Sequence, residues 1–124
     1  MSFVFLTVET VEAIHDAVLN PGELQGRAMG KSLESALARV DNRILYGLVG
    51  DVFDLAALYA MAIARGHCFN DANKRTAHQA MDVCLALNGV EMVWNHEDIG
   101  QQIIALAQGL IDDGHLADWL RDRA

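Results

Sequence analysis

Residues 66–76 read Gly-His-Cys-Phe-Asn-Asp-Ala-Asn-Lys-Arg-Thr and separate two long apolar patterns of helical period. The stretch gathers an imidazole, a carboxylate, two carboxamides and two adjacent cations in a short polar loop. A helix that begins just after this loop presents unpaired backbone N–H groups and the positive end of its dipole. A helix start of this kind is suited to bind phosphate. The stretch therefore predicts both the centre of the fold and the place of its chemistry.

The two patterns beside the loop predict long helices. Upstream, Asp51 is placed to cap a helix from Val52 to about Ala64, whose residues are apolar almost all round. A helix of that kind belongs in the middle of a core. Downstream, a helix is expected from about Asn73 to Leu87, with Asn88 and Gly89 as its C-terminal stop.

Helical periodicity covers most of the remaining chain, and Pro21 is the one proline. We expect one helix from about Val8 to Leu19, capped by Thr7, and a second helix that begins after the cap Ser32 and ends in a break at residues 47–50. Near the C-terminus we expect a helix from about Glu97 to Ile111, a break at residues 112–114, and a short last helix around residues 116–120. Residues 90–94 are expected to be extended. The predicted fold is all-α, a compact bundle of about six helices forming a single domain over residues 1–124.

Composition limits the classes of function. Hydrophobic residues make up 52% of the 124 residues, which suffices for a packed core. No apolar run approaches the roughly 20 residues that span a bilayer, and the N-terminus lacks signal-peptide features, so we expect a cytoplasmic protein without membrane contact. The net charge of −8 argues against direct nucleic-acid binding, which needs clustered Lys and Arg. A basic partner, or a metal that bridges to phosphate, fits this charge better.

Several other residues that could carry chemistry are expected to be structural. Cys68 and Cys84 form no CxxC pair and are interpreted as reduced, partly buried thiols. A zinc site built from them with His67 and His78 would match no familiar ligand spacing. His15 and His78 fall on predicted helices, where a satisfied structural role is expected.

His67 and Asp71 are the candidates for proton transfer and metal binding. His67 lies in a polar segment, and the ordinary pKa of histidine, near 6.5, suits proton transfer. The alternative is a capping or core histidine. Asp71, beside a phosphate site, is a natural Mg²⁺ ligand. It could equally cap the following helix, and the two roles compete for the same oxygens.

The start of the downstream helix is the candidate anion site. Lys74 and Arg75 stand in its first turn, where cations oppose the helix dipole. A polyphosphate would remove that conflict, with Asn73 and backbone N–H groups donating hydrogen bonds and the two cations supplying charge. Phe69, an isolated aromatic residue, is expected to anchor the loop in the core.

The segment from His67 to Arg75 resembles the signature His-x-Phe-x-Asp/Asn-Ala/Gly-Asn-Gly/Lys-Arg of the Fic/Doc (Fido) superfamily. Residues 33–39, 42–43, 46–47, 51–66 and 77–90 also resemble the Doc-type "death on curing" toxins of that superfamily. The resemblance implies an all-helical fold and, in residues 22–31, a flap with a small hairpin that docks the target peptide. The chain lacks the inhibitory motif Ser/Thr-x-x-x-Glu-Gly/Asn, so inhibition in cis is not expected and a separate Phd-like antitoxin is implied.

The resemblance also implies a role for each motif residue. His67 would be the general base that takes a proton from a target hydroxyl, and Asp71 would hold Mg²⁺. Asn73 and the helix-start amides would form the anion hole, while Lys74 and Arg75 would bind the phosphates of ATP. With Phe69 fixing the loop, the implied catalytic set is His67, Asp71 and Arg75.

Two residues depart from the commonest form of the motif. Ala72 replaces the commoner glycine, which is tolerated if its φ angle is negative. Lys74 stands where most Fic enzymes, which transfer AMP, have glycine. Doc-type proteins with this lysine resemble kinases that transfer the γ-phosphate, with elongation factor Tu as the known target of the family. Three hypotheses follow: a Doc-like kinase acting on a Ser or Thr hydroxyl, an AMP-transferase, and a catalytically silent binding module.

Overall fold

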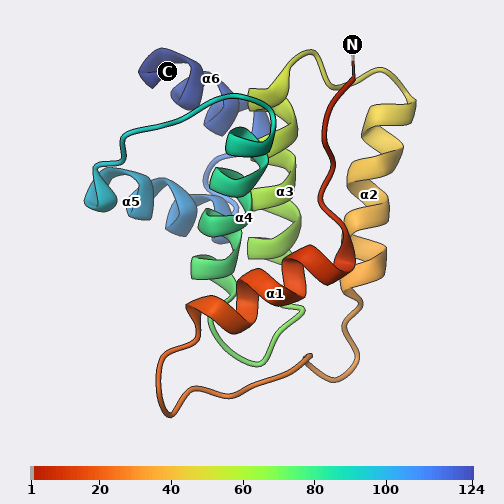
Figure 1. The fold of residues 1–124 in the computed structure, drawn as a ribbon, viewed down its shortest axis with the longest axis vertical. Coiled ribbons are helices and arrows are strands. Elements are labelled where there is room, and N and C mark those ends of the chain that lie inside the picture. Colours follow the sequence, from red (N-terminus) through yellow and green to blue (C-terminus); the bar gives the residue numbers. More distant parts are fainter. Residues whose placement is uncertain (1) are drawn as a thin grey trace.

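The computed structural model describes residues 2–124, and six helices but no strand form within that range (Figure 1). The helices are α1 (Val8–Val18), α2 (Leu33–Leu45), α3 (Val52–Gly66), α4 (Asn73–Leu87), α5 (His96–Ala107) and α6 (Asp113–Arg123). The predicted all-α class is therefore confirmed. None of these helices is long and apolar enough to cross a bilayer.

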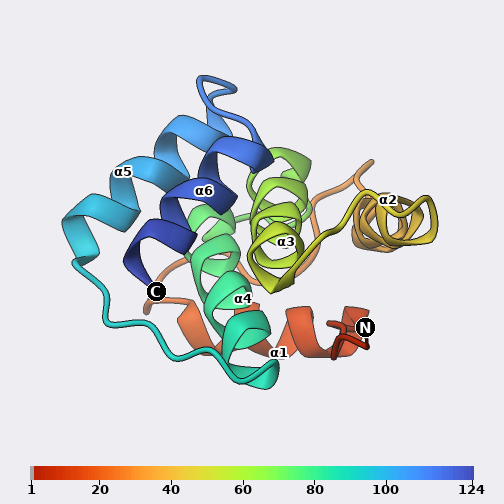
Figure 2. The ribbon, with the colours of Figure 1, turned by 90° about the horizontal axis from the view of Figure 1, so that it is seen from above.

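Helix α3 is the centre of the bundle, as its all-round apolar pattern predicts. It packs against α2, α4, α5 and α6, while α1 lies across α4 and α2 (Figures 1 and 2). Its buried side chains are Leu55, Ala56, Ala57, Leu58, Tyr59, Ala60, Ile63 and Ala64. Because α3 leads directly into the motif loop, the most buried helix of the fold positions the candidate site.

The predicted helix starts are confirmed at three caps. The side chains of Thr7, Ser32 and Asp51 accept a hydrogen bond from the backbone N–H three residues later, at the starts of α1, α2 and α3. Each cap satisfies one of the N–H groups that a helix start leaves unpaired.

The C-terminal helices differ from the prediction. Helix α5 ends at Ala107 instead of Ile111, because Gly109 adopts a φ of +76° and turns the chain. The break between the last two helices lies at residues 108–112 and not at 112–114, because α6 already begins at Asp113. Asp112 caps α6 by accepting a hydrogen bond from the His115 N–H at 2.8 Å, and α6 runs for 11 residues.

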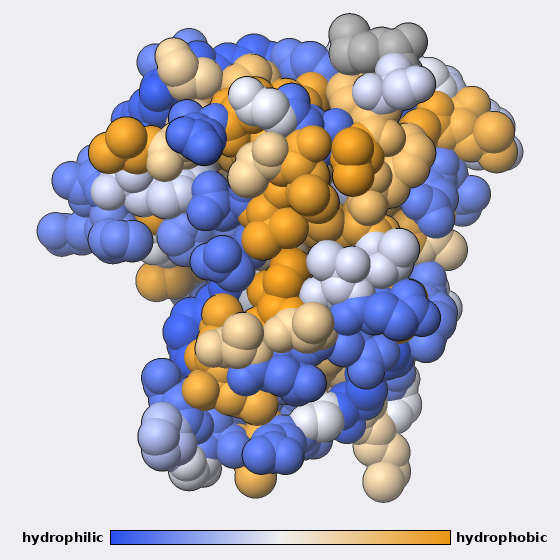
Figure 3. All heavy atoms as spheres, viewed as in Figure 1, coloured by the Kyte–Doolittle hydropathy of each residue, from blue (hydrophilic) through white to orange (hydrophobic). Residues whose placement is uncertain are grey.

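The N-terminal segment lies along the bundle beside α3 (Figure 1). The Leu6 N–H donates to the buried Tyr59 hydroxyl at 3.0 Å, and Asn88 pairs with both backbone groups of Val4. Apolar side chains gather in the middle of this face, with hydrophilic ones around them (Figure 3). Val4 and Phe5 of the N-terminal segment are among the exposed apolar residues of the protein.

Candidate active site

The motif loop joins α3 to α4 through two residues in the left-handed region. His67 has a φ of +49° and Ala72 a φ of +64°, and they are the two non-glycine residues with positive φ in residues 2–124. The condition under which alanine would be tolerated here, a negative φ, is therefore not met. Such conformations cost free energy and persist where the surrounding structure enforces them.

Asn73 closes the loop on itself. Its side chain accepts from the Phe69 N–H at 3.1 Å and donates to the Phe69 carbonyl at 2.9 Å. Phe69 is 3% exposed, as expected of an anchor. Ala72 occupies the cap position of α4, and no side chain caps the helix. The backbone N–H groups at its start are therefore available to an anion.

His15, on α1, packs against the motif loop and holds it in place. It is buried, and its ring stacks on Phe69 at 3.9 Å between centroids and 7° between planes. Its Nε2 lies 2.9 Å from the Asp71 carbonyl oxygen, which can only accept, so this nitrogen carries the proton. The satisfied structural role expected of His15 is confirmed. The sequence did not reveal that it holds the motif loop.

The side chain of Asp71 faces the flap and does not cap α4. Its Oδ2 accepts from the Leu24 N–H at 2.9 Å, and Oδ1 has no hydrogen-bond partner in residues 2–124. The capping alternative is therefore wrong, and the competition for the same oxygens disappears. A half-buried carboxylate with a free oxygen beside an uncapped helix start fits Mg²⁺, which takes one or two carboxylates together with phosphate oxygens.

The side chain of Arg75 is hydrogen-bonded, whereas those of Lys74 and His67 form no hydrogen bond to any described residue. The Arg75 guanidinium donates to the Val18 carbonyl and to the Glu23 carboxylate. The hydrogen bond with Glu23 raises the pKa of Arg75. The side chains of His67 and Lys74 are exposed and make no hydrogen bond within the described part of the chain. Both are accessible to a substrate.

The flap, residues 22–31, is an irregular loop, and the expected hairpin does not form. One isolated antiparallel bridge joins Arg27 to Phe69. It is extended by hydrogen bonds from the Ala28 N–H to the Cys68 carbonyl at 2.8 Å and from the Asn70 N–H to the Gly26 carbonyl at 3.1 Å. The flap therefore pairs with the motif loop itself.

Arg27 ties the flap to two helices. Its guanidinium contacts Glu12 of α1 at 2.6 Å and Glu34 of α2 at 2.7 Å. Hydrogen bonds with these two carboxylates raise the pKa of Arg27, so the arginine is charged at every physiological pH. The middle of the flap is thus held by both backbone and side-chain contacts.

The remaining candidates for chemistry are structural. Cys68 and Cys84 are free and buried, and burial raises the pKa of the Cys84 thiol to about 12. His78 packs against Trp94, and burial lowers its pKa. Its buried Nε2 has no hydrogen-bond partner in residues 2–124, so the satisfied role expected of this residue is wrong.

Comparison with known proteins agrees with this geometry. Residues 5–85, which contain the flap, the motif loop and most of α4, match a family model described as the Fic/DOC family. The chain belongs to the Fic/Doc family. It is 37% identical over 117 residues to the protein kinase Doc of Escherichia phage P1, and the alignment covers 94% of this chain and 92% of that protein.

Three features of this Fic/Doc site were missed from the sequence. The structure places Phe69, Asp71, Asn73 and Arg75 on one loop and helix start, and it adds His15, the Leu24 amide and Glu23. Glu23 stands in a glycine-containing loop with no motif around it, so no local signal marks it.

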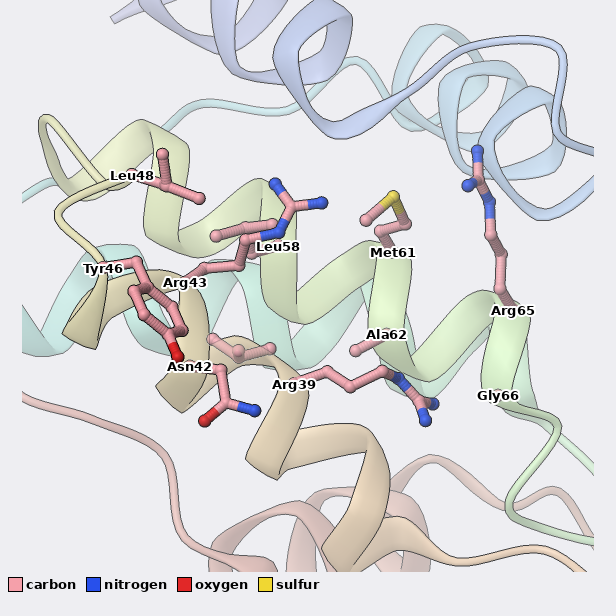
Figure 4. A pocket seen from close by; sticks show the side chains of 11 residues that line it. Arg39, Asn42, Arg43, Tyr46, Leu48, Leu58, Met61, Ala62, Arg65 and Gly66 are labelled. Atoms are coloured by element: carbon pink, nitrogen blue, oxygen red, sulfur yellow. The ribbon is translucent and has the colours of Figure 1, made fainter.

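A groove of about 530 Å³ lies between α2 and α3 (Figure 4). Its floor is apolar and its rim carries arginines from both helices. The residues that matter here are Val40, Leu58, Met61 and Ala62 on the floor, and Arg39, Arg43 and Arg65 on the rim. The groove runs to Gly66, the residue before His67.

Proposed function

We propose that this protein is a Doc-like toxin of a toxin–antitoxin module. Residues 1–124 would form a single domain, and this domain would act in the cytoplasm as a Mg²⁺- and ATP-dependent kinase. Its substrate would be a Ser or Thr hydroxyl on a translation factor, with elongation factor Tu as the first candidate. The observation that supports this most is the uncapped start of α4, with Asp71 and Arg75 beside it and an accessible His67 at the other end of the loop. The similarity to a phage protein kinase supports the same class of reaction.

In this proposal each residue has a positional or electrostatic task. His67 takes the proton of the target hydroxyl as the hydroxyl oxygen attacks the γ-phosphorus of ATP, and the bond from that phosphorus to the β–γ bridging oxygen breaks so that ADP leaves. Proton transfer of this kind contributes about 10²- to 10⁴-fold. The α4 N–H groups, Lys74 and Arg75 hold the phosphates and stabilise the charge that develops on them. Mg²⁺ held by Asp71 would supply further positive charge at the phosphate oxygens. Asn73 and Phe69 keep the loop in shape.

Label transfer tests the proposal. Purified protein is incubated with Mg²⁺, elongation factor Tu or whole lysate, and ATP labelled at either the γ- or the α-phosphate. We expect transfer of the γ label alone, abolished in His67→Ala and unchanged in His115→Ala, an exposed histidine on α6 that serves as the matched control. Transfer of the α label would identify an AMP-transferase, and transfer of neither label would favour the silent module.

Lys74 separates the two enzymatic hypotheses. Its exposed side chain, which makes no hydrogen bond to any described residue, adds bulk and charge at the phosphate site. Lys74→Gly should therefore lower γ-phosphate transfer and favour AMP transfer. Unchanged γ transfer in this variant would show that the lysine does not determine which phosphate reacts.

We also propose that the groove between α2 and α3 binds an acidic amphipathic helix of a Phd-like antitoxin. Three of the nine Lys and Arg residues in the chain line it, and no Asp or Glu does, although the net charge is −8. An apolar floor with a cationic rim is complementary to a helix with one apolar and one acidic face. A helix seated there would end next to His67.

A synthetic helical peptide with leucines on one face and glutamates on the other tests the groove. Arg39→Glu should weaken its binding, whereas Arg123→Glu, near the C-terminus, should not. A version of the peptide with lysines in place of glutamates should bind less tightly to the unmodified protein. Equal binding of the two peptides would contradict the proposal.

A further inference from the structure

His15 of α1 holds one particular peptide group of the motif loop, the one that joins Asp71 to Ala72. Its Nε2 donates to the Asp71 carbonyl oxygen at 2.9 Å, and its buried ring is fixed by the stack on Phe69. We propose that His15 is a positioning residue of the phosphate site, because it keeps this peptide in the orientation that leaves the Ala72 N–H free for the ligand. The inference rests on the proposed function, since it takes that ligand to be a nucleotide phosphate.

The orientation of this peptide decides which group faces the start of α4. The C=O and N–H of a trans peptide point in opposite directions, and no peptide bond in residues 2–124 is cis. Because the Asp71 carbonyl points at His15, the Ala72 N–H points away from α1. It makes no hydrogen bond within residues 2–124, and it directly precedes the N–H groups of the uncapped first turn. Successive N–H groups of this kind bind anions, so the Ala72 amide adds one donor to the phosphate site.

The backbone strain of Ala72 favours a different orientation. Its φ of +64° lies in the left-handed region, which an alanine adopts only at a cost in free energy. Rotating the Asp71–Ala72 peptide by half a turn would bring this φ to a negative value and relieve the strain. The same rotation would point the Asp71 carbonyl towards the phosphate site, where its partial negative charge would repel an anion.

Hydrogen bonds to the peptides on both sides of Ala72 oppose that rotation. On the following peptide, the N–H and the hydroxyl of Thr76 donate to the Ala72 carbonyl at 2.9 and 2.8 Å. On the preceding peptide, His15 is the one residue within 2–124 that donates to the Asp71 carbonyl. Rotation would leave a buried imidazole N–H without an acceptor, which is costly. His15 thereby offsets the strain at Ala72 and keeps the N–H of this residue available.

Substitutions that differ in reach test the inference on the full chain. The side-chain nitrogen of glutamine can replace Nε2, the nitrogen of asparagine ends near the place of Nδ1, and phenylalanine keeps a ring without a donor. In calorimetric titration with Mg²⁺ and ATP, His15→Gln should bind nearly as tightly as the unmodified protein. His15→Asn and His15→Phe should bind about 10- to 100-fold more weakly, the range for losing a group that orients ligand-binding residues. His115→Phe, at an exposed histidine on α6, is the matched control and should not change the affinity.

A merely structural role of His15 would give a different result. A variant that is partly unfolded has fewer binding sites per mole of protein, whereas the sites that remain keep their affinity. The fitted stoichiometry therefore reports the folded fraction, and the dissociation constant reports the geometry of the site. Circular dichroism at the temperature of the titration checks the folded fraction of each variant independently.

Residual dipolar couplings of the ¹⁵N-labelled protein report the orientation of the Ala72 N–H without any nucleotide. This coupling should change in His15→Asn and His15→Phe and be kept in His15→Gln. The coupling of Ala80, in the middle of α4, should stay constant throughout. These three expected results would support the inference.

Three outcomes would overturn the inference: an unchanged Ala72 coupling in His15→Phe, an ATP affinity in that variant equal to that of the unmodified protein, or an affinity as low in folded His15→Gln as in His15→Phe. If the unmodified protein binds no ATP while the Ala72 coupling still changes in His15→Phe, the proposed function is overturned and the orienting role of His15 stands.

Discussion

Replacing Ala72 by glycine should remove backbone strain at the start of α4. Ala72 has φ +64° and ψ +25°, the left-handed region. An L-residue there costs roughly 1–2 kcal/mol relative to the right-handed region. Glycine avoids that cost but loses more conformational entropy on folding, roughly 0.5–1 kcal/mol relative to alanine. We therefore expect Ala72→Gly to raise the free energy of unfolding by about 0.75 kcal/mol, the difference between the midpoints of these ranges.

A second alanine isolates the strain from the entropy. Ala38 is exposed in the middle of α2, in right-handed helical conformation. Ala38→Gly carries the same entropic cost without relief of strain, so it should destabilise by about 1 kcal/mol. The difference between the two variants in the change of unfolding free energy then measures the cost of the left-handed conformation, roughly 1–2 kcal/mol.

Urea denaturation measures this gap. The midpoint should rise slightly for Ala72→Gly and fall for Ala38→Gly, with the slope m unchanged. In thermal unfolding the two variants should differ by roughly 4–8 °C for a chain of this size. If Ala72→Gly lost as much stability as Ala38→Gly, Ala72 would not be left-handed in solution, and the account of the α4 start would be wrong.

Three further predictions follow from buried or paired groups. His15→Phe keeps a ring to stack on Phe69 but leaves the Asp71 carbonyl without its donor, so urea denaturation should show a loss of about 1–3 kcal/mol. Burial raises the pKa of Tyr59 to about 12, above its value near 10 in the unfolded chain. The contribution of Tyr59 to stability is therefore complete below pH 10 and is lost as the pH rises towards 12. Tyr59→Phe should flatten this part of a plot of unfolding free energy against pH. A hydrogen bond from Arg121 holds the pKa of Asp51 below its ordinary value of 3.8, so stability present above that pH is lost as pH falls further. Arg121→Gln should shift acid unfolding to higher pH, as followed by circular dichroism.

Sequence patterns predicted what depends on neighbours along the chain. The caps Thr7, Ser32 and Asp51 act on residues three positions away, and the all-round apolar composition of α3 requires a central place wherever its neighbours lie. The motif residues were found because they stand within nine positions of one another. The early end of α5 was missed because residues 108–111 continue the apolar pattern through a turn.

The contacts that shape the site could not be predicted in this way. His15 meets Asp71 across 56 positions, Arg75 meets Glu23 across 52, and Leu24 meets Asp71 across 47. Such pairs are decided by how α1 and the flap pack on the loop, and a single sequence carries no periodic signal for them. The left-handed φ of Ala72 has the same origin, since alanine alone favours a negative value.

The contact between Glu23 and Arg75 also resolves an electrostatic conflict that the sequence raised. Two cations in the first turn of α4 oppose its dipole, and an anion is needed to offset them. Glu23 supplies that anion for Arg75 from the flap, while Lys74 remains without a partner in residues 2–124. Because Glu23→Gln removes this pairing of charges, the variant should unfold at a lower urea concentration than the unmodified protein.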